Sequence, residues 1–254
     1  MTFSGILSQL SAFLPFGERR GKDSNRRIGE SSVGVVKSKS ESYNFSFGCY
    51  KIGKETVCGD EVASFDANGK KYVLISDGMG TGVEANALAK RLCIILQKLI
   101  INGIEPENAL GICAEIFSDL QSDECFATVD LLEFSPEKGL CFYKCGGAKS
   151  YVFCNGKIHA LPGGGYPFGI VEPFAVKIEF ACFEGEVVMC SDGGEGIGGF
   201  KLGELISKDK SLDCNQLAMR ICTYAKGLQN EKSADDVSIA VIKIEKLKNY
   251  SNIA

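Results

Sequence analysis

The sequence predicts an α+β protein in which two largely antiparallel sheets are flanked by helices. Strand-like segments come first, a consecutive pair of helical segments follows, and strand-like segments then return. This order is typical of α+β folds and not of alternating βαβ units. The two helical segments are joined by a short loop, so we expect an antiparallel helix pair and not two crossovers between parallel strands. Turn-forming residues separate most of the strands, as in hairpins.

Composition limits the classes of function. The chain has 254 residues, of which 45% are hydrophobic and 24% charged, so it fits one large globular domain or two small ones. A formal net charge of -4 argues against a nucleic-acid-binding surface spread over the protein. No apolar run reaches the roughly 18 residues of a membrane span. The first fourteen residues lack the basic start and cleavage site of a secretory signal.

Cysteine usage indicates the compartment. The sequence has twelve cysteines but no Cys-x-x-Cys pair, and most of them lie inside apolar runs. Buried free cysteines behave as small hydrophobic residues, so we expect reduced thiols in the core. Such thiols are typical of a reducing compartment, and a cytoplasmic location is therefore expected.

Residues 1–42 are expected to lie outside the main domain. Apolar side chains at helical spacing predict a short helix over residues 6–14, which Pro15 and Gly17 end. Residues 18–42 form a polar stretch with little to bury, which predicts a linker. Three roles stay open for the helix: docking on the domain or on a second copy of the chain, adsorption to a membrane surface, and disorder. Docking is favoured over membrane contact.

The main domain is expected to span residues 43–248, with a tail at residues 249–254. Alternating patterns predict strands over residues 43–52, 62–65 and 71–75, with a hairpin turn at Asp66-Ala67-Asn68-Gly69. A helix should run from about Val83 to Gly103, and a second should begin at Pro106. These elements form the first half of the predicted sandwich.

The second half is predicted to be mostly strands. They cover residues 128–134, 140–145, 150–155, 157–161, 176–183, 186–190 and 237–244, with a helix at about 214–228. The strands over 176–183 and 186–190 are expected to pair as a hairpin through Glu184-Gly185. The glycine-rich residues 192–199 are expected to be mobile.

Acidic residues follow or precede several predicted strands. They lie in the segments Gly59-Asp60, Ser76-Asp77-Gly78, Ser191-Asp192-Gly193 and Asp235-Asp236. A single segment of this kind can be an ordinary solvated turn. Two apolar strands that both end in Ser-Asp-Gly favour a common site, in which close carboxylates could not all stay ionised without cations. Crowded oxygen donors suit Mg²⁺ or Mn²⁺, and glycine allows the backbone to approach closely.

The order of these motifs carries a family resemblance. From about residue 43 to residue 246 the chain resembles the metal-dependent PP2C-type (PPM) serine/threonine phosphatases, in particular the bacterial sporulation stage II protein E (SpoIIE) branch. Each motif alone is weak, but their order and spacing over most of the chain make the signal strong. Besides the acidic segments above, the matching pieces are Met79-Gly80, Thr128-Val129-Asp130-Leu131, Gly146-Gly147, Pro167-Phe168-Gly169-Ile170 and Val237-Ser238.

The resemblance implies an αββα sandwich with two Mn²⁺ or Mg²⁺ ions at one end, which activate a bridging water for direct attack on a phosphomonoester. Matched by motif, Asp77 would bridge both ions and Gly78 would offer its backbone carbonyl. Asp60 would serve one ion, and Asp192 and Asp235 the other. The family's pattern uses the first residue of the final acidic pair, so Asp235 is favoured over Asp236.

Two positions depart from the eukaryotic members of the family. Met79 stands where those members carry a histidine, and the only histidine of the chain, His159, lies on a predicted hairpin far from the acidic motifs. An imidazole general acid is therefore not expected.

The resulting hypothesis is a cytoplasmic metal-dependent phosphoserine/phosphothreonine protein phosphatase. The resemblance implies a role in sporulation and sigma factor regulation, with the phosphoserine form of a small anti-anti-sigma factor as substrate and a homodimer as one arrangement. Two alternatives remain: a non-catalytic PP2C-like module that binds a regulator, and a phosphatase for small-molecule phosphoesters. Retention of all the acidic positions favours the enzyme over the binding module.

Overall fold

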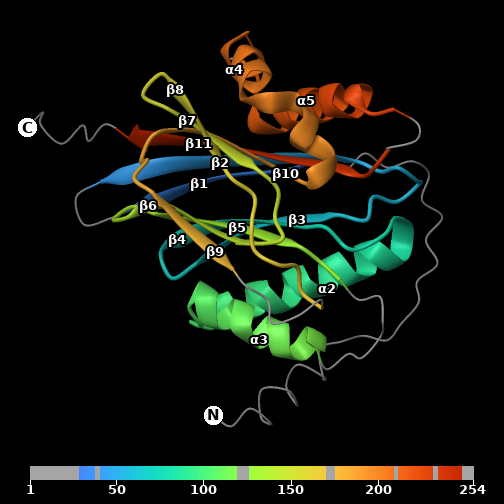
Figure 1. Cartoon of the computed structure of the whole chain (residues 1–254). Helices are drawn as coiled ribbons and strands as arrows, with labels where there is room; N and C mark the ends of the chain where they lie inside the picture. Colours follow the sequence, from blue (N-terminus) through green and yellow to red (C-terminus); the bar gives the residue numbers. More distant parts are fainter. Residues whose placement is uncertain are drawn as a thin grey trace, which may run out of the picture.

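Two antiparallel sheets pack face to face, and a pair of helices covers each outer face (Figure 1). This computed structural model describes residues 29–37, 41–118, 126–169, 175–208, 211–230 and 234–247. The predicted α+β sandwich is confirmed. The helix predicted over residues 6–14 and the tail at residues 249–254 lie outside the described residues.

The larger sheet has six strands in the order β1-β2-β11-β10-β7-β8, and every neighbouring pair is antiparallel. Its central strands carry the longest buried runs, whereas β1 and β8 form the two edges. The bounds are β1 Gly29–Lys37, β2 Ser42–Ile52, β7 Ser150–Cys154, β8 Lys157–Leu161, β10 Gly185–Cys190 and β11 Val237–Leu247.

Strand β1 corrects one expectation. Its residues were assigned to a polar linker, but they pair with β2 along their whole length. The strand is an edge strand with one sheet neighbour, and Val33 is 73% exposed while Val36 is only 6% exposed. An edge strand that buries so few side chains has a largely polar sequence, so its composition is that of a linker.

The smaller sheet has five strands in the order β3-β4-β5-β6-β9. The predicted turn between β3 and β4 is confirmed, because Asn68 and Gly69 both have positive φ angles of 52° and 72° and connect the last paired residues Ala67 and Lys70. The bounds are β3 Glu61–Ala67, β4 Lys70–Ser76, β5 Val129–Ser135, β6 Gly139–Cys145 and β9 Val176–Phe180.

The predicted hairpin between β9 and β10 is wrong. Strand β9 pairs with β6 in the smaller sheet, whereas β10 pairs with β7 and β11 in the larger one. The chain crosses between the sheets at Glu184-Gly185, where Gly185 packs so tightly that a Cβ atom would lie 2.2 Å from the carbonyl oxygen of Phe153. A glycine turn between two alternating strands has the same local pattern whether the strands pair or separate.

Helices α2 (Gly82–Ile101) and α3 (Pro106–Ser118) cover the smaller sheet, and α4 (Gly198–Lys208) and α5 (Cys214–Leu228) cover the larger one (Figure 1). Helix α4 was not predicted. The glycine-rich residues before it, expected to be mobile, form the 3₁₀ helix η1 (Asp192–Ile197). Glycine disfavours helix, but burial of Leu202, Leu205 and Ile206 against the sheet outweighs that preference.

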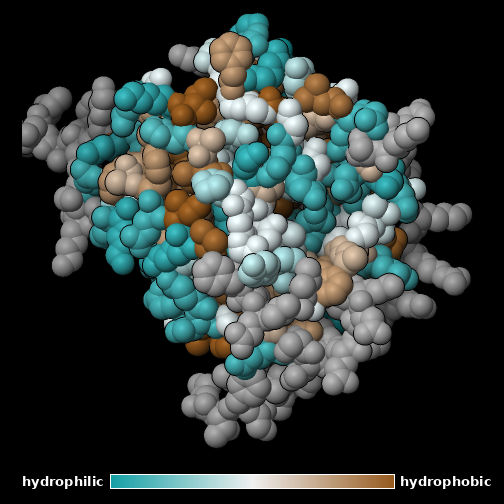
Figure 2. Space-filling view, viewed as in Figure 1, coloured by the Kyte–Doolittle hydropathy of each residue, from teal (hydrophilic) through white to brown (hydrophobic). Residues whose placement is uncertain are grey.

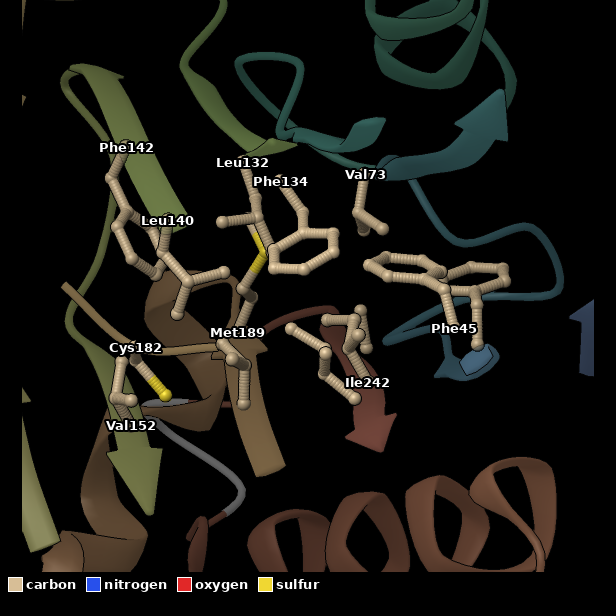
Figure 3. Packing of buried hydrophobic residues seen from close by; sticks show 14 of the residues in the cluster. Phe45, Val73, Leu132, Phe134, Leu140, Phe142, Val152, Cys182, Met189 and Ile242 are labelled. Carbon is tan, nitrogen blue, oxygen red and sulfur yellow. The ribbon is translucent and has the colours of Figure 1, made fainter. Parts of the chain in front are cut away.

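The space between the sheets holds an aromatic and aliphatic core (Figure 3). Phe134 packs edge-on against Tyr43 and nearly parallel to Phe45, with ring centroids 5.5 Å and 6.0 Å apart. Side chains from both sheets interlock here, so the sheets have a fixed relative position. The C-terminal ends of β4 and β10 and the start of β11 consequently come together at one end of the sandwich, as the contacts described below show.

The surface and the cysteines agree with this packing. On the face shown in Figure 2, apolar side chains gather in small groups separated by polar ones. None of the described helices combines the length and the apolarity that crossing a membrane requires. None of the cysteines among the described residues forms a disulfide bond, and all of them except Cys58 are buried.

Candidate metal centre

Four of the acidic residues predicted as ligands meet at one end of the sandwich. Asp77 follows β4, Asp192 follows β10, Asp60 precedes β3, and Asp235 comes shortly before β11. Burial raises the pKa of Asp77, and the charges of Asp60, Asp192 and Asp235 raise it further. Burial and the charge of Asp235 also raise the pKa of Asp192. The strands thus bring together carboxylates that repel one another.

Asp60 is the most buried member of this group. Its exposed fraction is 0%, and neither of its carboxylate oxygens has a well-formed hydrogen bond to any described residue. Burial raises its pKa to about 6, the charge of Asp236 acts in the same direction, and the hydroxyl groups of Ser238 and Ser191 act against it. A buried carboxylate without partners is costly. Two free oxygens at this position therefore fit coordination of a cation.

The turn that carries Asp77 is held by the segment before β5. Thr128 receives one hydrogen bond from Asp77 and returns another: Asp77 N–H donates to Thr128 Oγ1 at 3.2 Å, and Thr128 N–H donates to the Asp77 carbonyl at 2.8 Å. At Gly78 a Cβ atom would lie 2.1 Å from the carbonyl oxygen of Ala85 in α2. Only glycine fits here, so the first turns of α2 pack directly on the candidate site.

The two residues of the final acidic pair have different surroundings. Asp236 is buried, and its Oδ1 and Oδ2 accept hydrogen bonds from the backbone N–H groups of Lys54 and Gly59 at 2.5 Å and 2.6 Å. Asp235 is half-buried, and its charge acts on Asp77 and Asp192. Asp236 therefore braces the loop that leads into Asp60, while Asp235 faces the other carboxylates.

A second possible ligand set consists of Cys58, Asp60 and Asp236. One ligand atom of each residue lies within 4.8 Å of those of the other two. Burial and the charges of Asp60 and Asp236 raise the pKa of the Cys58 thiol to about 12. A thiol binds metal as the thiolate, and Asp236 already uses both oxygens for backbone donors. This trio is a poorer ligand set than Asp60 with the three carboxylates around Asp77.

Other polar residues at the site were not predicted from the sequence. Gln229, just after α5, donates from Nε2 to the Gly193 carbonyl at 3.0 Å and accepts from Asp235 N–H at 3.1 Å, so it links the loops of Asp192 and Asp235. Lys51 and Asn86 both donate to the backbone carbonyl of Asp60. A lone amide or lysine has no local sequence signature, so only the folded chain reveals these contacts.

His159 lies in the hairpin of β7 and β8, as the sequence predicted. His159 lies in β8 against the ring of Phe180, with centroids 4.9 Å apart, and Met79 is exposed beside the Asp77 turn. The chain's only imidazole therefore lies in a strand at the edge of the larger sheet.

Comparison with known proteins places these features in a family. The family model described as Stage II sporulation protein E (SpoIIE) matches residues 67–245. The stage II sporulation protein E of Priestia megaterium is 28% identical over 226 residues, covering 79% of this chain and 38% of that protein. The protein of the same name from Bacillus subtilis (strain 168) is 25% identical over 223 residues, covering 83% of this chain and 27% of that protein. The chain therefore corresponds to well under half the length of these relatives.

Solved structures share the fold. The PP2C phosphatase domain of SpoIIE from Bacillus subtilis, with a fragment of its regulatory domain, has a TM-score of 0.67 at 22% identity, covering 86% of this chain and 71% of that one. A serine/threonine phosphatase of S. agalactiae has a TM-score of 0.62 at 14% identity, covering 86% and 100%. RsbX in complex with magnesium has a TM-score of 0.58 at 14% identity, covering 84% and 100%. With the family match over most of its length, the chain belongs to the SpoIIE family and has the fold of a PP2C-type phosphatase domain.

Proposed function

We propose that this protein is a metal-dependent serine/threonine phosphatase that acts on a phosphoprotein. The observation that carries the proposal is Asp60, a fully buried carboxylate whose two oxygens have no hydrogen-bond partner in the described part of the chain and which lies beside three further carboxylates. Asp60, Asp77, Asp192 and Asp235, with the backbone carbonyl of Gly78, would hold two Mn²⁺ or Mg²⁺ ions. Bound there, the ions would neutralise the carboxylates and activate a water for attack on phosphorus.

The chain's own residues fix the position of these candidate ligands. Thr128 holds the backbone of Asp77 from both sides, and Asp236 ties the Asp60 loop to the start of β11. Gln229 links the loops that carry Asp192 and Asp235 by one hydrogen bond to each loop. Because the only imidazole lies in β8, the proton for the leaving serine or threonine oxygen would come from solvent and not from a histidine.

The substrate proposal rests on family membership. We infer a phosphoserine form of a small anti-anti-sigma-type regulator, acting in the cytoplasm, as the substrate class for a chain related to sporulation proteins. One structural neighbour is described as the RsbU and RsbW domains of Rv1364c from Mycobacterium tuberculosis, and another belongs to a bacterial stressosome. A homodimer through residues 6–14 remains a prediction.

Hydrolysis of para-nitrophenyl phosphate with and without Mn²⁺ tests the proposal. Wild-type protein should turn over substrate only with metal, and Asp77→Asn and Asp192→Asn should each abolish turnover. Asp66→Asn is a matched control, because Asp66 is an exposed aspartate in the β3–β4 region whose partner is Lys71. Activity that is retained in both site variants, or that needs no metal, would contradict the proposal. Faster hydrolysis of a phosphoserine protein than of small phosphoesters would support the substrate class.

A further inference from the structure

A buried ion pair lies next to the candidate metal centre. Asp130 of β5 and Lys144 of β6 face each other across the strands, and their side chains are 3% and 0% exposed. Lys144 Nζ donates to Asp130 Oδ2 at 2.5 Å, to the Ala148 carbonyl at 2.7 Å and to Ser150 Oγ at 2.9 Å. An ammonium group has three N–H donors, so all of them are used.

The carboxylate of Asp130 is only half satisfied by these contacts. Its Oδ2 accepts hydrogen bonds from Lys144 and from Ser150 Oγ at 3.1 Å. Its Oδ1 is buried and has no hydrogen-bond partner among the described residues. Since a buried acceptor without a partner is costly, this oxygen needs a donor that none of the described residues provides.

A cavity of about 20 Å³ supplies room for that donor. Its lining includes Asp130 together with Asp77 and Asp192 of the candidate metal centre. This volume is enough for about one water molecule, and the carboxylates offer the two or more polar partners that a buried water requires. Gly147 closes the cavity beside Asp130, where a Cβ atom would lie 3.2 Å from the Asp130 Cβ.

The geometry points to Asp130 as a positioning residue whose Oδ1 holds one water molecule in this cavity. The water donates to Asp130 Oδ1 and to a carboxylate of Asp77 or Asp192. The Lys144–Asp130 pair, fixed by four hydrogen bonds within the protein, thereby sets the orientation of one candidate ligand. The positioning role rests on the proposed metal-dependent function. The presence of the water can be tested whether or not the protein is an active phosphatase.

Charge favours water over a further cation at this position. The ammonium of Lys144 already neutralises the carboxylate of Asp130 inside the same buried cluster. A neutral donor can satisfy Oδ1 without adding charge beside a buried ammonium, whereas a cation would be repelled by it. Asp130 thus differs from Asp60, neither of whose carboxylate oxygens has a hydrogen-bond partner among the described residues.

The first test is crystallographic. Crystals of the wild-type protein, grown with and without Mn²⁺ and measured with anomalous scattering from manganese, should show one water within hydrogen-bonding distance of Asp130 Oδ1 and no manganese signal there. An empty cavity, or manganese in it, would overturn the inference. Either result is read from the cavity alone, so it is distinct from failure of the phosphatase proposal, which is read from hydrolysis.

The second test measures Mn²⁺ affinity by titration calorimetry. Changes in the outer partners of metal ligands typically weaken metal binding by about 10- to 100-fold. Asp130→Asn should therefore weaken Mn²⁺ binding by about tenfold or more. Glu133→Gln is the matched control, because Glu133 is also a buried acidic residue of β5. Its side chain contacts Tyr72 and Lys70 on the face of the smaller sheet that α2 and α3 cover. It should leave Mn²⁺ affinity unchanged even where it lowers thermal stability.

A second variant guards against misfolding of Asp130→Asn. Gly147→Ala keeps all charges and places a methyl group against Asp130 at the cavity. It should displace the water and weaken Mn²⁺ binding in the same direction. Unchanged Mn²⁺ affinity in whichever of these variants folds would overturn the positioning role.

Discussion

Asp236 accepts a 2.6 Å hydrogen bond from the backbone N–H of Gly59, although 177 residues separate the two in the chain. The other oxygen of Asp236 accepts from Lys54 N–H, so one carboxylate fixes both ends of the loop before Asp60. The neighbouring Asp235 makes no such contact with this loop in the described structure and instead faces the carboxylates around Asp77. Two adjacent aspartates therefore have separable roles.

Asp236→Asn should lower stability, because the amide group would turn N–H donors toward a backbone N–H that needs an acceptor. Loss of a buried hydrogen bond of this kind costs about 1–3 kcal/mol. Urea denaturation of the metal-free protein measures the change. Asp235→Asn is the matched variant: it should leave the free energy of unfolding nearly unchanged or raise it by easing repulsion, yet abolish metal-dependent hydrolysis. The reverse pattern would show that the two roles have been exchanged.

Gln229→Ala should reduce activity with little loss of stability. The side chain joins Gly193 and Asp235, so its removal frees the loops that carry two candidate ligands. A loss of about tenfold in activity or Mn²⁺ affinity is expected for such a supporting contact. Gln216→Ala provides the control at the other end of α5, where Gln216 forms a capping box with Asp213. That variant should lose about 1 kcal/mol of stability and keep normal Mn²⁺ affinity. Equal effects of the two variants on metal binding would refute the bridging role of Gln229.

The metal-free protein should lose stability as the pH rises. The pKa of Asp60 is raised to about 6 and that of Asp77 is raised as well, so the folded state binds protons more tightly than the unfolded state. Stability from these groups is present below their unfolded pKa, near 4, and is lost as the pH rises through the folded values. Asp60 alone would contribute up to about 3 kcal/mol.

Thermal unfolding of EDTA-treated protein between pH 5 and pH 8 measures this dependence. The wild-type melting temperature should fall over this range more than that of Asp60→Asn, because asparagine does not titrate. Mn²⁺ added at pH 8 should restore the lost stability, since a bound ion favours the folded state. If the melting temperatures of wild type and Asp60→Asn fall in parallel as the pH rises, the pKa of Asp60 is not raised in the folded protein.

Much of the fold could be predicted because local patterns coincide with the final elements. The Asn68-Gly69 turn, the start of α3 at Pro106 and the alternating strands from residue 43 onward are all specified by nearby residues. The errors arose where distant partners decide. Strand β1 is an edge strand, the Gly185 turn crosses between sheets, and α4 forms on the larger sheet despite its glycine-rich start.

The same distinction holds at the site. Asp60, Asp77, Asp192 and Asp235 could be identified because each stands in a short motif at the end or start of a strand. Their supporting residues could not, because Gln229, Lys51 and Lys144 act through contacts that folding alone creates. The burial that leaves Asp60 without a partner is likewise a property of the packed sandwich and not of its own segment.

Titration of Mn²⁺ into EDTA-treated protein, followed by calorimetry, tests the central claim most directly. The wild-type protein should bind two ions, Asp60→Asn should lose at least one of them or bind it at least tenfold more weakly, and Asp66→Asn should match the wild type. Absence of binding to the folded wild-type protein, or identical binding by Asp60→Asn, would contradict a metal centre built on this buried carboxylate.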